Sequence, residues 1–334
     1  MEWVSGLLGG ASRQTCAAAF PPDRYYCLLD ELPVHLIPRG SSGLLRENLS
    51  GPLFLNPDCL FRPASQLPDE MAAQPGLVAN FALQGTLAWV SDLTTETLLP
   101  FWIGPRLESA LRNLRSGQDA SGHLSQEDCR ILLASGVLHQ GGSRPLGRTK
   151  ESHEELRKHY CEENYGIFPA LIHPFQVAAL RRYYRCLIRK GAIQQPDPQC
   201  PQRLVAHNEP VARFFHHQLT NVVSAIAGEP VKPSYVYLAS YQPGAELKKH
   251  TDREQCEFSI SFCLDFSPEP ERETPWPLCL DTPRGKIKIH QSLGDGLFYR
   301  GTRVPHYRDV LAGGMTSTSI FFHYVSANFT GPLD

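Results

Sequence analysis

The sequence lacks a long hydrophobic run. No stretch approaches the roughly 20 apolar residues that a helix needs to cross a bilayer, so we predict no membrane-spanning segment. Its first eight residues also lack the basic segment and the longer apolar run of a secretory signal peptide. These two absences favour a cytoplasmic location.

The sequence also lacks an excess of charge of either sign. It has 32 Lys and Arg residues against 34 Asp and Glu residues, which gives a formal net charge of −2, and its pI is about 6.7. A nearly neutral chain generates no strong field toward phosphate backbones or anionic lipids. We therefore expect a peptide or small-molecule partner and neither nucleic acid nor membrane.

Cysteine pairs with metal-site spacing are missing as well. The ten cysteines are scattered, and no two are separated by the two residues typical of structural zinc sites and redox dithiols. We expect reduced and mostly buried thiols. No internal repeat or low-complexity tract is present either, which disfavours solenoids and propellers.

The sequence does contain enough apolar residues for a folded core, since 42% of its 334 residues are hydrophobic. The composition and the hydrophobic periodicity of the sequence change near position 150. Residues 1–100 are rich in Pro and Gly with short apolar runs, helical periodicity follows over 107–114 and 125–138, and residues 141–148 resemble a linker. We predict a mixed or helical accessory domain over 1–150, with a possible role in substrate recognition, and a second domain over 151–334.

Two helices are predicted at the start of the second domain. Residues 174–191 begin with a proline and end at a glycine around an apolar stripe, and residues 210–227 follow the same pattern with Asn208 or Glu209 as the N-cap. Within the first helix, arginines recur every four residues and share one face. We interpret that face as solvated rather than as a grip for a substrate carboxylate. The arginines are Arg181, Arg185 and Arg189.

After Gly228 the hydrophobic period changes from 3.6 to 2, which indicates strands. Several short strands separated by Gly and Pro turns favour a sandwich or a jelly-roll barrel. The predicted class is therefore α+β, with helices that precede a sandwich or a jelly-roll barrel. The expected strands are 235–241, 256–266, 286–290, 296–300, 304–311 and 318–325.

Three histidines are followed by an acidic residue two positions later, and roughly one such match is expected by chance. His153 and His207 lie at predicted helix starts, where a structural role in capping suffices. His250 instead precedes the strongest alternating strand, and residues i and i+2 of an extended segment point the same way. His250 and Asp252 could therefore bind one metal ion.

A third ligand for that ion is available in His306, at the start of a later predicted strand. Barrel closure could bring it opposite His250. Two histidines and one carboxylate on one face leave three octahedral positions open, as in non-haem Fe(II) sites, whereas structural zinc is usually enclosed by four ligands. The alternative, that these histidines are half-buried polar groups without a metal, stays open on spacing alone.

Further motifs around these residues give the chain a family resemblance. It resembles the 2-oxoglutarate and Fe(II)-dependent oxygenases, in particular their prolyl-hydroxylase-like branch, whose barrel is a double-stranded β-helix. The shared elements cover about 230–325. They are Tyr241-x-Pro243-Gly244, His250-x-Asp252, the alternating strand that follows, Gly294-Asp295-Gly296, and His306 before the final strand Ser319-Ile320-Phe321-Phe322.

The resemblance implies iron bound by His250, Asp252 and His306, with 2-oxoglutarate chelating it. The family usually places a basic residue about ten positions after the second histidine, but Thr316 stands there. Arg308 is the only Arg or Lys after His306, and its planar guanidinium suits a carboxylate. We predict Arg308 as the cosubstrate anchor. Four hydroxyl side chains are expected to hydrogen-bond to the cosubstrate: Tyr237, Tyr241, Ser317 and Ser319. The alternative anchors are Arg300, Arg303 and a lysine on an inner strand. Two further residues are candidates for the pocket wall, Asn208 and His323.

The resemblance also implies the reaction. O2 and 2-oxoglutarate would be consumed, succinate and CO2 released, and an unactivated C–H bond hydroxylated in a peptide side chain or an amino-acid-derived natural product. Family halogenases replace the metal-binding carboxylate by a small residue, so Asp252 disfavours halogenation. Two other functions stay open: a cupin-like module that binds metal without turnover, and a zinc-dependent hydrolase with an open coordination position.

Overall fold

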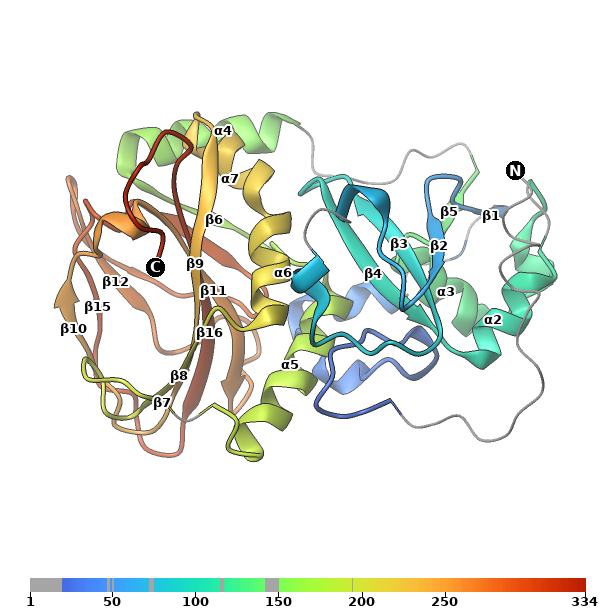
Figure 1. Ribbon diagram of the computed structural model, residues 1–334, viewed down its shortest axis with the longest axis horizontal. Coiled ribbons are helices and arrows are strands. Elements are labelled where there is room, and N and C mark those ends of the chain that lie inside the picture. Colours follow the sequence, from blue (N-terminus) through green and yellow to red (C-terminus); the bar gives the residue numbers. More distant parts are fainter. Residues whose placement is uncertain are drawn as a thin grey trace.

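The computed structural model describes residues 20–46, 49, 51–71, 75–114, 117–141, 150–193 and 195–334. A barrel built by the second half of the chain lies beside a smaller part built by the first half, with helices between them (Figure 1). All ladders between its strands are antiparallel. The chain is thus a mixed α and β protein, as the sequence predicts.

Eight strands of the second half are divided between two sheets, and the chain changes sheet at every step from β9 to β16 except between β12 and β13. One sheet has the order β10-β15-β12-β13, and the other contains β14-β11-β16-β9, extended by β6 on one side and by β8 and β7 on the other. This alternation is the strand order of a jelly roll. The strands are β6 (Tyr165–Phe168), β7 (Gln195–Pro196), β8 (Arg203–His207), β9 (Val231–Tyr241), β10 (Leu247–His250), β11 (Phe258–Ser267), β12 (Leu278–Thr282), β13 (Gly285–Ile289), β14 (Gly296–Tyr299), β15 (His306–Arg308) and β16 (Thr316–Ser326).

Alternation along β11 decides which face of the larger sheet meets the helices. Phe258, Ile260 and Phe262 belong to the core shared with the helices. Ser259 and Ser261 are also buried, but they point to the opposite face, into the barrel. The apolar face of this strand is therefore the outer one, and small polar side chains are left to line the interior.

Four helices accompany the barrel: α4 (Lys150–Glu163), α5 (Pro174–Arg189), α6 (Pro210–Gln218) and α7 (Thr220–Ala227). The predicted helix over 174–191 corresponds to α5. The single helix expected over 210–227 is divided at Leu219 into α6 and α7. Next to this division the Thr220 hydroxyl donates to the His217 carbonyl at 2.8 Å. Glu209 caps α6 by accepting a hydrogen bond from the Ala212 N–H at 3.0 Å.

The prediction of a solvated arginine face on α5 is wrong. The Arg181 side chain is fully buried and donates to Asp265 at 3.0 Å and to Glu269 at 2.6 Å. Arg185 donates to Asp265 at 2.6 Å, and only Arg189 is exposed. The acidic partners lie on β11 and just after it, about 80 residues away in sequence, so the helix pattern alone could not reveal them.

We expect Arg181→Met to lower the free energy of unfolding by about 3 kcal/mol, because it leaves the part-buried Glu269 carboxylate without its arginine and removes one of the two arginines that bind Asp265. Chemical denaturation with urea measures the change. Arg189→Met is the matched control on the same helix, where an exposed side chain should cost less than about 0.5 kcal/mol. Equal stabilities of the two variants would contradict a buried ion-pair role for Arg181.

The first half of the chain forms a three-stranded sheet in the order β2-β3-β4 and a pair β1-β5. The helical periodicity predicted over 125–138 corresponds in part to α3 (Gln126–Ala134), where Ser125 accepts from the Asp128 N–H at 3.1 Å. Val34–Leu36 forms a 3-10 turn. The elements are β1 (Leu53–Leu55), β2 (Leu60–Pro63), β3 (Thr86–Asp92), β4 (Thr97–Ile103), α2 (Pro105–Arg112), α3 (Gln126–Ala134) and β5 (Leu138–Gln140).

One hydrophobic core runs through both halves of the chain. It contains Tyr25 and Trp102 from the first half together with Phe175 and Phe215 from the second, and the Tyr25 hydroxyl donates to the Gln176 side chain. In Figure 1 α5 and α6 lie between the barrel and the first half. The proposed linker at 141–148 lies outside the described residues except for Gly141, and the boundary near 150 stays a prediction.

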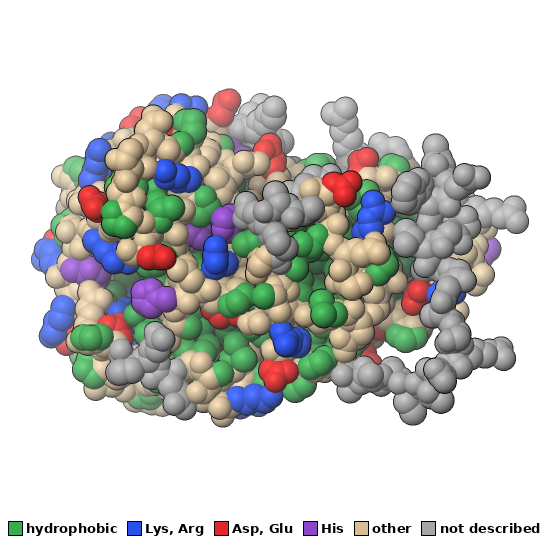
Figure 2. Space-filling view, viewed as in Figure 1, with side chains coloured by type: hydrophobic (Ala, Val, Ile, Leu, Met, Phe, Trp, Pro, Cys, Tyr) green, Lys and Arg blue, Asp and Glu red, His purple; other side chains and the backbone are tan. Residues whose placement is uncertain are grey.

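The nine described cysteines are all free thiols, and all but Cys161 are buried, as the scattered spacing predicts. Among the described residues no helix has both the length and the apolarity to cross a membrane. Positive and negative side chains are interspersed over the face of the molecule shown in Figure 2.

Candidate metal centre

Strand pairing brings the two predicted histidine ligands together. In the ladder between β10 and β15, His250 lies directly opposite His306, and their ring centroids are 4.4 Å apart. The His306 side chain is almost fully buried, with 3% exposed, while His250 retains 24%. The expectation that barrel closure places His306 opposite His250 therefore matches the structure.

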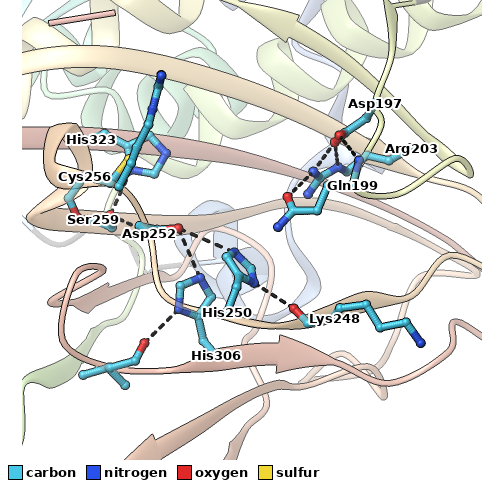
Figure 3. Close-up of polar contacts among 12 residues, drawn as sticks. Asp197, Gln199, Arg203, Lys248, His250, Asp252, Cys256, Ser259, His306 and His323 are labelled. Atoms are coloured by element: carbon cyan, nitrogen blue, oxygen red, sulfur yellow. Dashed lines mark hydrogen bonds and ion pairs between the residues drawn. The ribbon is translucent and has the colours of Figure 1, made fainter. Parts of the chain in front are cut away.

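A backbone carbonyl orients each of these imidazoles. Nδ1 of His250 lies 2.8 Å from the Lys248 carbonyl oxygen, and Nδ1 of His306 lies 2.9 Å from that of Val304. A carbonyl only accepts, so each Nδ1 carries a proton, and in the neutral imidazole Nε2 has the lone pair. Such outer contacts fix the tautomer of metal-binding histidines. Both Nε2 atoms face Asp252 (Figure 3).

Asp252 completes the group from the loop after β10, where its N–H donates to the Gly301 carbonyl at 2.9 Å. Its Oδ1 lies 3.6 Å from Nε2 of His250 and 3.5 Å from Nε2 of His306. Burial alone would raise the pKa of Asp252, but hydrogen bonds from the two imidazoles, when a proton occupies Nε2 in place of a metal ion, hold that pKa well below its usual range. The carboxylate is therefore ionised and available to a cation.

The geometry of these three residues fits a divalent metal ion. Ligands bound at about 2.1 Å and about 90° apart are about 3 Å from one another, so the two separations between Asp252 and the histidines need a closure of about half an ångström. The donor set of two imidazoles and one carboxylate on one side leaves the other side open. His250, Asp252 and His306 are thus the residues that would hold the ion.

Gly301 makes room for this carboxylate. A Cβ at that position would lie 2.3 Å from Oδ2 of Asp252 and 2.5 Å from the Cys256 carbonyl oxygen, both well inside van der Waals contact. The loop that carries Asp252 can therefore approach β14 and β15 only if residue 301 has no side chain.

We expect Gly301→Ala to weaken metal binding roughly 10- to 100-fold, because it displaces the Asp252 carboxylate while leaving all three ligands in the chain. Isothermal titration of the metal-free protein measures the affinity. Gly313→Ala is the control, since a Cβ there meets nothing within 4 Å. An unchanged affinity in the Gly301 variant would mean that the carboxylate does not bind the ion in this position.

The ligands open onto a cavity of about 390 Å³ inside the barrel. Sequence reasoning missed most of its walls, including Arg203 and His207, which share the inward face of β8. The spacing of Arg203, Val205 and His207, two positions apart along a strand, could have indicated that these side chains share one face. The lining side chains include Asp197, Gln199, Arg203, His207, Tyr235, Tyr237, Leu247, Arg253, Cys256, Leu278, Tyr299, Phe321 and His323.

Arg203 is a cation whose charge is already balanced. Its Nε and Nη2 both contact the Asp197 carboxylate, and the two side chains are 5% and 7% exposed. Nη1 donates to the Tyr241 hydroxyl at 3.0 Å, and the Tyr237 hydroxyl donates to Asp197 at 2.8 Å. The hydroxyls of Tyr237 and Tyr241 are therefore engaged with this ion pair (the pair itself is shown in Figure 3).

Arg308, the predicted anchor, is buried on the same strand as His306 and is 4% exposed. It is not among the residues that line the cavity. Nη1 donates to the Trp276 carbonyl at 2.7 Å, Nε has no hydrogen-bond partner, and no carboxylate in the described chain lies within ion-pair distance. Burial lowers the pKa of Arg308. Within the part of the chain that the structure describes, this cation in the barrel interior thus has no carboxylate partner.

The other candidates lie in different surroundings. Ser317 and Ser319 are buried on β16 and share its inward face with the cavity residues Phe321 and His323; their roles stay predictions. Asn208 donates to Asp334 at 2.9 Å and does not line the cavity. The competing anchors are elsewhere: Arg300 pairs with Glu257 at 3.6 Å, and Arg303 is exposed.

A second set of polar side chains lies on the other side of Asp252. Oγ of Ser259 lies 3.3 Å from Oδ2 of Asp252 and 2.8 Å from Nδ1 of His323, which is opposite Ser259 in the β11–β16 ladder. The Cys256 thiol is adjacent, 3.0 Å from the Tyr235 hydroxyl. The two oxygens of Asp252 therefore face two different sets of side chains.

Comparison with protein-family models and with curated proteins found no match. Solved structures do resemble the chain. They include the non-heme alpha ketoglutarate dependent epimerase SnoN from nogalamycin biosynthesis, with 12% identity over 54% of this chain and 82% of that one and a TM-score of 0.45. A Pseudomonas putida prolyl-4-hydroxylase shows 15% identity over 53% of this chain and 100% of its own, with a TM-score of 0.44.

A third similar structure is HygX from Streptomyces hygroscopicus with nickel, 2-oxoglutarate and hygromycin B bound. It has 12% identity over 53% of this chain and 88% of its own, with a TM-score of 0.42. The similarities to all three structures cover about half of this chain. At this level of similarity they assign no activity to it.

Proposed function

We propose that the protein is an Fe(II)- and 2-oxoglutarate-dependent oxygenase that hydroxylates an unactivated C–H bond. The observation that carries the proposal is the one-sided group of His250, Asp252 and His306 at the wall of a barrel cavity. An open side is what an ion needs if it is to bind a chelating cosubstrate and O2 together. When bound, the iron supplies the redox chemistry that couples decarboxylation of the cosubstrate to oxidation of the substrate.

Arg308 supports the cosubstrate part of the proposal. A fully buried guanidinium with an unpaired Nε is costly unless an anion joins it. A dicarboxylate whose first end reaches the metal has a second carboxylate left to neutralise such a charge. Arg203 lines the cavity, which Arg308 does not, but it suits that role less well, because Asp197, Gln199 and the Tyr241 hydroxyl already accept from its donors.

Apolar side chains around the metal group support chemistry that must exclude water. Leu247, Leu278 and Phe321 line the cavity beside the ligands, and the Tyr299 ring packs edge-on against His306 at 4.8 Å. These walls limit the water available to compete with the substrate. The carbonyls of Lys248 and Val304 keep the proton on each Nδ1, so that Nε2 remains free.

The proposed substrate is a peptide side chain or an amino-acid-derived natural product. A cavity of about 390 Å³ lies at the small end of the range for small-molecule sites. The mixture of aromatic, cationic and amide groups in its wall offers both stacking and hydrogen bonds. The aliphatic part of a side chain fits this space, while the remainder of a peptide would stay outside it.

Uncoupled turnover tests the proposal without knowledge of the substrate. We expect purified protein to release succinate from 2-oxoglutarate only when both Fe(II) and O2 are present, as measured by chromatography of the acid products. Replacing Fe(II) by Zn²⁺ should abolish succinate formation. A protein that binds Fe(II) but forms no succinate above the zinc control would instead be a metal-binding module or a hydrolase.

A further inference from the structure

The cavity contains a second set of metal-binding side chains, distinct from the two histidines on β10 and β15. Asp252, Cys256 and His323 each present a donor atom, and these atoms lie within 4.8 Å of one another. Cys256 and His323 are 2% and 6% exposed, and both line the same cavity as the first group. A cation that enters the cavity therefore reaches either set.

The two carboxylate oxygens of Asp252 separate the two sets. Oδ1 faces Nε2 of His250 and His306 at 3.6 and 3.5 Å, whereas Oδ2 faces Ser259 at 3.3 Å. Figure 3 shows Asp252 between the imidazoles of His250 and His306 on one side and Cys256, Ser259 and His323 on the other. A single carboxylate can thus bind two neighbouring cations, as in two-metal sites.

The chemistry of the second set differs from that of the first. A thiolate is a soft ligand and favours Zn²⁺ and Co²⁺ binding, whereas imidazole and carboxylate alone do not distinguish these ions from Fe(II) so strongly. The Tyr235 hydroxyl, 3.0 Å from Sγ of Cys256, can donate to the thiolate once it forms. Ser259 holds the His323 ring through Nδ1 at 2.8 Å.

We propose that Cys256, His323 and Oδ2 of Asp252 form a second divalent-cation site with affinity for Zn²⁺. Binding replaces the S–H bond of Cys256 by a metal–sulfur bond and releases the proton to solvent. Because Asp252 is common to both sets, a cation at this site draws the carboxylate away from the ion held by His250 and His306. Zinc at this second site would then weaken ion binding at the first site, in addition to competing for the first site directly.

Co²⁺ is the probe for this site, because a thiolate bound to Co²⁺ gives a charge-transfer absorption in the near ultraviolet that imidazole and carboxylate ligands do not give. We expect titration of the metal-free protein with Co²⁺ to produce this band. Cys256→Ser should lose it and still bind Co²⁺ at the first site. Cys263→Ser, a buried cysteine elsewhere in the barrel, should keep it.

Two more variants make the outcome independent of the proposed activity. His306→Ala disrupts the first set and should keep the band, whereas His323→Gln should weaken Co²⁺ binding at the thiolate site at least tenfold. Absence of the band from the wild-type protein at saturating Co²⁺, or its persistence in Cys256→Ser, would overturn the second site. Succinate formation can succeed or fail in either case, so the two proposals are tested separately.

Discussion

Asp252→Ala should reduce Fe(II)-dependent succinate formation at least about 100-fold while leaving the protein folded. Loss of a group that only orients a ligand already costs roughly 10- to 100-fold in affinity or activity, and here a ligand itself is lost. The fold should survive because the side chain projects from a loop into the cavity and belongs to no hydrophobic cluster. Succinate release and circular dichroism measure the two effects.

The control for this prediction is His290→Ala, which removes an exposed histidine of the same barrel. We expect wild-type succinate formation from it at the same metal concentration. If the Asp252 variant lost its ellipticity together with its activity, the carboxylate would be structural and the metal centre would lose its support. Full activity in that variant would contradict the ligand assignment directly.

Arg308→Met should raise the Michaelis constant for 2-oxoglutarate roughly 10- to 100-fold. The hydrogen bonds of a charged donor are worth about 1.5–3 kcal/mol, and each 1.4 kcal/mol is a factor of ten. The same variant should be at least as stable as the wild type, because methionine relieves the barrel of a buried charge that no described carboxylate balances. Steady-state kinetics and urea denaturation measure the two quantities.

A raised Michaelis constant together with an unchanged or raised free energy of unfolding distinguishes a ligand anchor from a structural arginine. A structural arginine would lose stability on substitution and leave the Michaelis constant unchanged, which would contradict the anchor. Arg300→Met is the control, since its partner Glu257 lies outside the cavity. We expect the 2-oxoglutarate dependence of that variant to match the wild type.

The sequence predicted the parts of the fold that depend on local patterns. The alternation over 256–266 corresponds to β11, the proline and glycine around 174–191 delimit α5, and the helical periodicity over 125–138 corresponds in part to α3. The spacing of His250 and Asp252 indicated a metal group for the same reason, because two positions along an extended chain fix a common direction. The prediction of His306 as the third ligand required only the assumption that the barrel closes.

What the sequence could not predict depends on partners that are distant along the chain. Arg181 looked solvated because Asp265 and Glu269 lie on another element, and the Asp197–Arg203 pair joins two residues whose charges say nothing of their burial. β12 escaped notice because Leu278–Thr282 follows a proline-rich stretch and is only five residues long. Tertiary contacts decide each of these cases.

The shared core sets a limit on how the protein can be divided. Cys27 contacts the Phe175 carbonyl at 3.5 Å, Arg182 stacks on Tyr26 at 3.5 Å, and Arg181 donates to the Leu36 carbonyl at 2.6 Å. A truncated chain starting at 151 would expose these aromatic and aliphatic surfaces and leave a buried guanidinium short of one acceptor. Such a fragment should aggregate, so kinetic measurements on this barrel need residues of the first half to be present.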